Sequence, residues 1–212
     1  MASPLVVGFD LDMTLIDSRA GIAATYRALT AQTGVPVDAE AAISRLGPPL
    51  RVELANWFPA DRVEEAVRAY RALYPAYAIA ASPLLPGAGE AVAAVRARGG
   101  RVVVITSKLG RLASLHLDHV GLAVDDVIGD RFAGGKGRAL AEHGVCAYVG
   151  DHVADVTAAR SAGTLAIGVT TGPCDARELL DAGADEVLED LTAFPAWLDG
   201  YLLDADAASR LP

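Results

Sequence analysis

Residues 5–14 read LVVGFDLDMT and place two carboxylates directly behind a short apolar run. The run at residues 5–9 is typical of a buried strand in a parallel sheet, because such strands are almost continuously apolar. Side chains two positions apart leave a strand in the same direction, so Asp10 and Asp12 are expected to face one small volume. Two desolvated carboxylates repel each other unless a cation or a shared proton lies between them. The stretch therefore favours metal-assisted chemistry.

Two later apolar runs also end in polar residues. Residues 102–105 (VVVI) lead into Thr106, and residues 147–149 (AYV) lead into Gly150 and Asp151. In an open α/β sheet the ligand site lies at the carboxyl ends of the strands, so these ends are expected to meet in one crevice. The convergence favours a functional site. The alternative is that the first two acids are solvated loop residues in front of a helix.

Lysine is rare in this chain. Of the 18 basic residues, only Lys108 and Lys136 are lysines, and both lie near the polar strand ends. Lys136 is expected to bring an ammonium into the site. The alternative is a coding bias towards arginine that happened to leave two lysines. Lys108 is compatible either with a contact to substrate or with a solvated cation that opens the next helix.

These residues together resemble the motifs of haloacid dehalogenase superfamily hydrolases, in the phosphoglycolate phosphatase-like group with a helical cap of the C1 type. The motifs are DxDxT, a strand ending in Thr or Ser, a Lys, and GDxxxD, and all four occur in order. The resemblance covers essentially the whole chain. It implies an α/β fold with a Rossmann-like, three-layer parallel sheet core and an inserted helical cap. It also implies a Mg²⁺-dependent phosphatase that hydrolyses a small phosphate monoester through a phospho-aspartate intermediate.

The resemblance also implies residue roles. Asp10 would be the nucleophile, and Asp12 the acid that protonates the leaving oxygen and later activates water. Thr106, Ser107 and Lys136 would bind the phosphoryl oxygens. The implied Mg²⁺ ligands are carboxylates and one backbone carbonyl, from Asp10, Asp12, Asp151 and Asp155.

Elementary chemistry agrees with these roles. A carboxylate attacks a phosphate dianion poorly because both are negative, so a divalent cation and an ammonium are needed to cancel the charge. Oxygen-only ligands suit Mg²⁺ better than zinc, which prefers His or Cys. The four His and two Cys of the chain show no such clustering.

The sequence departs from the family pattern at three places. Met13 stands where Gly is usual. Lys136 is followed by Gly137 rather than Pro, and it lies only 15 residues before Asp151. His152 replaces the usual Ser or Thr, and it is compatible either with tuning the metal's surroundings or with a partly exposed side chain that is merely tolerated.

Composition bounds the class of protein. With 212 residues, of which 52% are hydrophobic, the chain is long enough for one core and a small appended module. The net charge of −9 and the lack of a basic stripe argue against nucleic acid as a large ligand. We find no signal peptide and no apolar stretch of membrane length, and Cys146 and Cys174 look unpaired. A cytoplasmic protein without a membrane partner is expected, and its oligomeric state is open.

The segment at residues 16–82 has helical periodicity and turn signals, so it is expected to form the cap domain. Residues 1–15 and 83–212 would then form the core domain, in which strand and helix patterns alternate. The expected strands are 101–106, 126–128, 146–150, 164–169 and 185–188. The expected helices are 88–98, 109–120, 137–143, 153–162 and one from about residue 191.

Within the cap segment, residues 45–50 (RLGPPL) resemble the substrate-specificity loop of phosphoglycolate phosphatase-like enzymes. Arg45 could pair with an anionic group of the substrate, such as a small phosphorylated metabolite. It is equally compatible with an exposed cation at the end of a helix.

Several functions remain open. A phosphomutase of the β-phosphoglucomutase type would share every catalytic group, and a catalytically silent binding module would share the fold. A haloacid dehalogenase is disfavoured by Asp12, because that chemistry has no leaving alkoxide to protonate. A phosphonatase is disfavoured because the cap segment contains no lysine.

Overall fold

The computed structural model describes residues 4–208 and contains one six-stranded sheet in the order β3-β2-β1-β4-β5-β6. All of its strand pairs are parallel. This arrangement confirms the expected α/β fold with a parallel sheet. The strands are β1 (Val6–Phe9), β2 (Arg101–Ile105), β3 (Asp126–Ile128), β4 (Ala147–Gly150), β5 (Leu165–Val169) and β6 (Glu186–Leu188).

The first strand, β1, lies in the middle of the sheet. Phe9 pairs with Val104 of β2 on one side and with Val149 of β4 on the other. The chain order reverses at this strand, and open α/β sheets bind ligands outside the carboxyl ends of the strands at such a point. The segments that follow β1, β2 and β4 therefore leave the sheet side by side.

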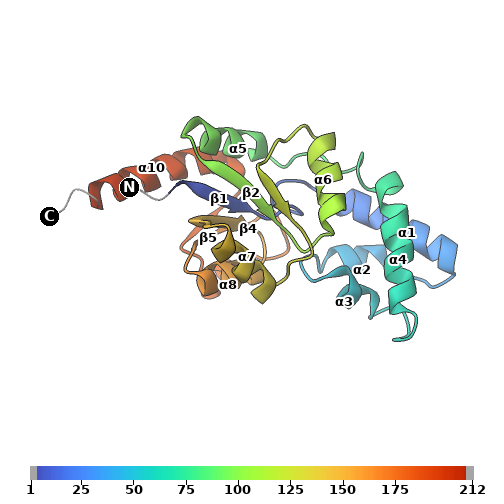
Figure 1. Cartoon of the computed structure of the whole chain (residues 1–212). Helices are drawn as coiled ribbons and strands as arrows, with labels where there is room; N and C mark the ends of the chain where they lie inside the picture. Colours follow the sequence, from blue (N-terminus) through green and yellow to red (C-terminus); the bar gives the residue numbers. More distant parts are fainter. Residues whose placement is uncertain (1–3, 209–212) are drawn as a thin grey trace.

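Two layers of helix cover the sheet. Val7 and Phe9 point into an apolar cluster with one set of helices, while Val6 points into a second cluster on the opposite face. Figure 1 shows the two helical layers on either side of the strands. The first layer holds α5 (Ala88–Ala97), α6 (Gly110–His119), the 3₁₀ turn Leu191–Ala193 and α10 (Phe194–Ala208); the second holds α7 (Gly134–Glu142), α8 (Val153–Ala162) and α9 (Ala176–Asp181).

Four helices between β1 and α5 share an apolar cluster, which Leu112 of α6 also joins. The rings of Tyr26 and Tyr70 pack in it with their centroids 4.8 Å apart and their planes tilted by 46°. Figure 1 shows this group to one side of the sheet, and we refer to it as the cap helices. The cap helices are α1 (Arg19–Thr33), α2 (Ala39–Ile43), α3 (Leu50–Leu54) and α4 (Val63–Tyr77).

The two connections between the sheet and the cap helices run side by side. Ile16 forms an antiparallel bridge with Leu84, and the Asp17 N–H donates to the Pro83 carbonyl over 2.9 Å. The cap helices are therefore joined to the sheet by two adjacent chain crossings.

One helix begins earlier than predicted. Helix α7 starts at Gly134 rather than at Gly137, so Lys136 lies in its first turn and not in a loop. The weak helix propensity of consecutive glycines favoured the later start. The packing of α7 on α8 overrides it, because a Cβ on Gly137 would lie only 2.4 Å from the Ser161 hydroxyl. In the described part of the chain, no helix is long and apolar enough to cross a membrane.

Candidate active site

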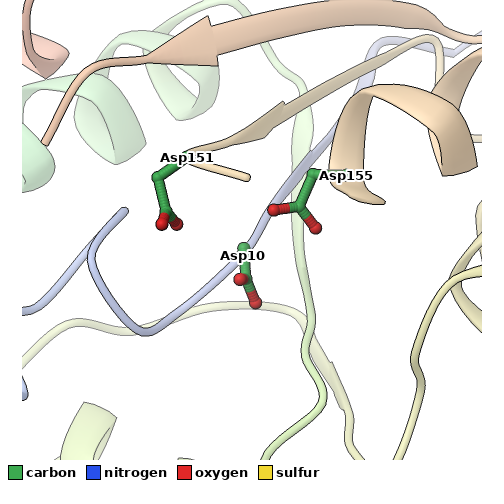
Figure 2. A group of neighbouring side chains, drawn as sticks. All are labelled: Asp10, Asp151 and Asp155. Carbon is green, nitrogen blue, oxygen red and sulfur yellow. The ribbon is translucent and has the colours of Figure 1, made fainter. Parts of the chain in front are cut away.

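Three buried carboxylates meet at the carboxyl edge of the sheet. Asp10 follows β1, Asp151 follows β4, and Asp155 lies in the first turn of α8. As whole residues they are only 7%, 2% and 3% exposed. One oxygen atom from each lies within 4.8 Å of the other two, and Figure 2 shows the three side chains gathered in this way. The geometry brings these three predicted metal ligands together.

The start of α8 explains the GDxxxD spacing. The His152 N–H donates to Asp155 Oδ2 over 3.2 Å, and His152 Nδ1 accepts from the Ala154 N–H over 3.0 Å. These reciprocal bonds form a capping box, in which side chains satisfy the free N–H groups of the first turn. Gly150 has room for no side chain, since a Cβ there would lie 2.4 Å from Asp155 Cβ. His152 is therefore an N-cap that helps to orient Asp155.

Asp151 is held from two sides. Thr14, the last residue of the DxDxT motif, donates its hydroxyl to Asp151 Oδ1 over 2.8 Å. On the other side, a Cβ on Gly172 would lie 1.9 Å from Asp151 Oδ2. Sequence reasoning assigned no role to Thr14 or Gly172, although Thr14 lies inside the motif that it used.

Lys136 supplies the one ammonium beside this cluster among the described residues. Its Nζ lies 2.5 Å from Asp155 Oδ1 and 3.1 Å from Asp10 Oδ1, and its side chain is 4% exposed. Three ionised carboxylates against one ammonium leave two negative charges in a buried volume. That excess is what a divalent cation would neutralise.

The pKa values of these groups reflect the same excess of negative charge. Burial raises the pKa of Asp10 to about 6, with Lys136 opposing the rise and Asp155 adding to it. Burial, followed by repulsion from Asp155 and Asp10, raises the pKa of Asp151 well above its usual value. Burial lowers the pKa of Lys136, but the two adjacent carboxylates outweigh it and the net pKa is raised.

A magnesium ion fits this set of groups. Asp10 Oδ1 is buried with Lys136 Nζ 3.1 Å away, but no well-directed hydrogen bond reaches this oxygen within the described chain, so it remains available to a metal ion. The donors are all oxygen, which is the donor set that Mg²⁺ prefers.

Asp12 belongs to a second pair. Lys108 Nζ donates to Asp12 Oδ1 over 2.6 Å, and the two side chains are 8% and 19% exposed. Burial by itself raises the pKa of Asp12, but the charge and hydrogen bond of Lys108 more than offset it, so the pKa is lowered. The interpretation of Lys108 as a solvated cation is wrong, because the side chain folds back onto Asp12.

The segment after β2 contributes two of the predicted phosphate ligands. Thr106 is fully buried, and its Oγ1 accepts from the Lys108 N–H over 3.2 Å. The Ser107 hydroxyl instead donates over 3.2 Å to the carbonyl of Gly47, in the loop between α2 and α3. Ser107 thus contacts the cap helices' side of the site, while Thr106 lies at the end of β2.

A cavity of about 210 Å³ lies between the cap helices and the core. Asp10, Asp12 and Asp151 line its core side, and Arg45 lines its cap side. Arg45 is also engaged within the cap, since its guanidinium donates to Glu53 over 2.7 Å and 3.3 Å. Arg45 therefore faces the cavity as half of an ion pair.

Two further residues in this region were missed by sequence reasoning. The Tyr74 hydroxyl from α4 accepts from Lys108 Nζ over 2.8 Å and lies 3.0 Å from His116 Nε2 of α6. A tyrosine on a helix of apolar periodicity reads as a core residue, so the sequence carries no signal for this contact.

Family models match most of the chain. The model for haloacid dehalogenase-like hydrolases matches residues 7–160, and a model for HAD-hydrolase-like proteins matches residues 136–194.

Curated relatives differ in how much of them this chain spans. It is 39% identical over 121 residues to the tyrosine-protein kinase PtkA of Mycobacterium tuberculosis, which covers 57% of this chain and only 42% of that protein. It is 33% identical to the "Probable phosphatase IndB" of Dickeya dadantii, over 80% of this chain and 82% of the relative. It is also 33% identical to the phosphoglycolate phosphatase of Chromobacterium violaceum, over 84% of this chain and 89% of the relative.

Solved structures share the fold. A haloacid dehalogenase-like family protein from Streptococcus pneumoniae superposes with a TM-score of 0.79 at 25% identity, covering 95% of this chain and 100% of the other. A "predicted phosphatase" from Clostridium acetobutylicum superposes with a TM-score of 0.80 at 24% identity, covering 93% and 99%. These likenesses confirm the Rossmann-like core.

Proposed function

Because this chain belongs to the haloacid dehalogenase-like hydrolase family, we propose that it is a phosphatase that transfers the phosphoryl group of a small monoester to Asp10 and then to water. The observation that carries the proposal is the buried cluster of Asp10, Asp151 and Asp155 with Lys136. A cluster with two uncompensated negative charges is costly to bury. It is suited to binding a divalent cation together with a phosphate.

The metal ion would be bound by the carboxylates of Asp10, Asp151 and Asp155 and by the backbone carbonyl of Asp12. When bound, Mg²⁺ would supply positive charge that reduces the repulsion between the carboxylate and the phosphoryl oxygens. Lys136 contributes a fixed ammonium to the same end, because its Nζ already lies 3.1 Å from Asp10 Oδ1. Thr106 adds a buried hydroxyl at the neighbouring strand end.

Asp10 then attacks phosphorus with one carboxylate oxygen, and the bond from phosphorus to the leaving oxygen breaks. Asp12, in its protonated form, gives its proton to that leaving oxygen. The resulting Asp12 carboxylate accepts a proton from water, which attacks the phosphoryl group on Asp10 and releases inorganic phosphate. The ion pair with Lys108 stabilises Asp12 in the ionised form that this second step needs.

The cap helices are closed over the site in this structure. The Gly47 carbonyl accepts from Ser107, and a Cβ on Gly47 would lie 2.7 Å from the His152 ring. Arg71 of α4 pairs with Asp130 of the core over 3.3 Å. Closure of this kind keeps bulk water from the reacting groups and limits the size of the leaving group.

The cavity favours a compact substrate. A volume of about 210 Å³ suits a small phosphorylated metabolite, and Arg45 at its far side suits an anionic group on that metabolite. The phosphoglycolate phosphatases among the relatives are consistent with such a substrate. The free thiols of Cys146 and Cys174 are consistent with a cytoplasmic enzyme.

Phosphate release from a panel of small phosphate esters, with Mg²⁺ and with EDTA, tests the proposal. We expect Mg²⁺-dependent release from a few related esters, and loss of that release in Asp10→Asn. No release from any ester would overturn the proposed phosphatase. Conversion of a sugar phosphate into its isomer, without net release, would instead identify the phosphomutase alternative.

A further inference from the structure

Met13, in the middle of the DxDxT motif, has a left-handed backbone conformation. Its φ is +61°, although it is not a glycine. At such a φ the Cβ crowds the neighbouring backbone, so a residue other than glycine keeps this conformation only where its surroundings hold it there. The Met13 residue is buried, at 2% exposed. A strained residue is therefore built into the turn that carries the proposed nucleophile.

Hydrogen bonds hold the backbone of Met13 at both ends. Its N–H donates to the Ile16 carbonyl over 2.8 Å, inside the turn that follows β1. Its carbonyl accepts from the Thr171 hydroxyl over 2.5 Å, and Thr171 lies in the loop between β5 and α9. The first bond is local, but the second comes from a residue 158 positions later in the chain. The Thr171 hydroxyl thus ties the turn after β1 to the loop after β5.

The backbone on either side of Met13 leads to two parts of the proposed metal site. The peptide group before it carries the Asp12 carbonyl, which the proposed function assigns to the metal ion. The residue after it is Thr14, whose hydroxyl donates to Asp151 Oδ1 over 2.8 Å. A change in φ or ψ at Met13 would turn these two parts relative to each other. The conformation of Met13 therefore sets how they meet.

The loop that carries Thr171 also contacts Asp151. Gly172 is the next residue, and a Cβ there would lie 1.9 Å from Asp151 Oδ2. Thr14 and Gly172 therefore lie against the two oxygens of one carboxylate. The bond from Thr171 to Met13 joins the two segments that carry them. Loss of this bond would loosen both segments at once.

We propose that Thr171 is a positioning residue for the metal site, because its hydroxyl holds Met13 in the left-handed conformation. That conformation fixes the Asp12 carbonyl relative to Asp151. The inference rests on the proposed function, in which both groups bind Mg²⁺. Thr171 acts through the backbone of Met13, so its removal should change the affinity of the site for Mg²⁺.

Calorimetric titration of Mg²⁺ into Thr171→Val, without substrate, tests the proposal. Valine has nearly the shape of threonine but no hydroxyl, so the Met13 carbonyl loses its donor. We expect the dissociation constant for Mg²⁺ to rise roughly 10-fold, as it does when other residues that orient metal ligands are removed. Thr171→Ser keeps a hydroxyl and should bind Mg²⁺ nearly as tightly as the wild-type protein.

Thr170→Val is the matched control. Thr170 is the neighbouring residue, and its hydroxyl donates over 3.2 Å to the carbonyl of Glu189, which follows β6. The substitution removes the same kind of bond from the same loop, but not one that reaches the turn after β1. Its affinity for Mg²⁺ should be unchanged. Unchanged affinity in Thr171→Val, or an equal loss in both valine variants, would overturn the inference.

A glycine at position 13 provides a second comparison. Glycine adopts a positive φ without steric cost, so in Met13→Gly the Thr171 hydroxyl has less strain to offset. We expect Thr171→Val to cost clearly less Mg²⁺ affinity in this background than in the wild-type background. The same loss in both backgrounds would contradict the proposed role. If Thr171→Val alone folds poorly, recovery of the fold in the double variant supports that role, and no recovery overturns it.

Hydrogen exchange in EDTA supplies a readout that needs no metal. The N–H groups of residues 13–16 all donate within the turn after β1. We expect them to exchange faster in Thr171→Val than in Thr170→Val, and equal exchange would contradict the inference. Failure of the proposed function has a different signature, namely phosphate release that survives Asp10→Asn while the Mg²⁺ affinities follow the pattern above. A wild-type protein that binds no Mg²⁺ would overturn both.

Discussion

Lys136 Nζ lies 3.1 Å from Asp10 Oδ1, and the two side chains are only 4% and 9% exposed. The ammonium also bonds Asp155, so one buried cation serves two of the three clustered carboxylates. The nucleophile proposed here is thus held beside a fixed positive charge. The same charge is available to a phosphoryl group that approaches Asp10.

Replacement of Lys136 should therefore abolish most of the activity. We expect Lys136→Met to lower kcat roughly 100-fold or more, because a fixed charge on the reacting phosphoryl group is lost. Arg138→Met is the control, since Arg138 is an exposed basic residue on the same helix. Phosphate release at saturating Mg²⁺ measures both variants, and near wild-type turnover in Lys136→Met would contradict the role given to the ammonium.

Gly172 should prove necessary for metal binding. A methyl group at this position would lie 1.9 Å from Asp151 Oδ2 and would displace the carboxylate. We expect Gly172→Ala to weaken Mg²⁺ binding about 10-fold, as displacement of a ligand's supporting contacts typically does. Gly89→Ala, at a helical site with open space around it, should leave binding unchanged. Titration calorimetry with Mg²⁺ compares the two variants. Equal affinities would contradict the prediction that Gly172 keeps Asp151 in place for metal binding.

Stabilisation by Mg²⁺ should grow with pH. The folded-state pKa of Asp10 is raised to about 6, from an unfolded value of about 4. Without metal, the folded protein therefore binds more protons than the unfolded chain between these values. The contribution of Asp10 to stability is present below about pH 4 and is lost as pH rises through about 6.

Metal binds the ionised carboxylates, so Mg²⁺ should reverse that loss. We expect the rise in Tm on adding Mg²⁺ to be clearly larger near pH 7.5 than near pH 5. Thermal unfolding with Mg²⁺ and with EDTA at both pH values provides the measurement. A shift in Tm that is the same at the two pH values would argue against proton competition at the cluster.

Arg45 should affect substrate binding more than turnover. If its guanidinium binds an anionic group across the cavity, Arg45→Gln should raise KM about 10-fold with little change in kcat. The control is Arg27→Gln, which breaks an exposed ion pair with Glu40 in the same group of helices. Unchanged KM in Arg45→Gln would leave Arg45 as a structural partner of Glu53.

The sequence was a good guide wherever an apolar run met a polar residue. Val6–Phe9 and Ala147–Gly150 were recognisable as strands, and the chain direction alone placed Asp10 and Asp151 at one edge. Periodicity could not determine the strand order, because neighbours in a parallel sheet are set by crossover connections rather than by local pattern.

Sequence patterns could not predict the contacts between segments that are far apart in the chain. Lys108 has a long flexible side chain, and whether it faces water or Asp12 depends on Tyr74, which lies 34 positions earlier on a cap helix. The importance of Gly172 is visible only in the structure, where a Cβ at this position would lie 1.9 Å from Asp151 Oδ2. For Lys136, the motif was found but its helical setting was not, because the packing of α7 on α8 outweighed the local effect of the glycines.

The most direct test of the central claim is a rapid-mixing measurement with Asp12→Asn and p-nitrophenyl phosphate in Mg²⁺. Asp10 can still displace the activated leaving group, but the phosphoryl group then leaves Asp10 slowly, because no base activates water. We predict that Asp12→Asn releases a burst of nitrophenolate close to one equivalent per active site. The double variant that also carries Asp10→Asn should show no burst. A burst of the same size without Asp10 would contradict the proposal that this carboxylate accepts the phosphoryl group.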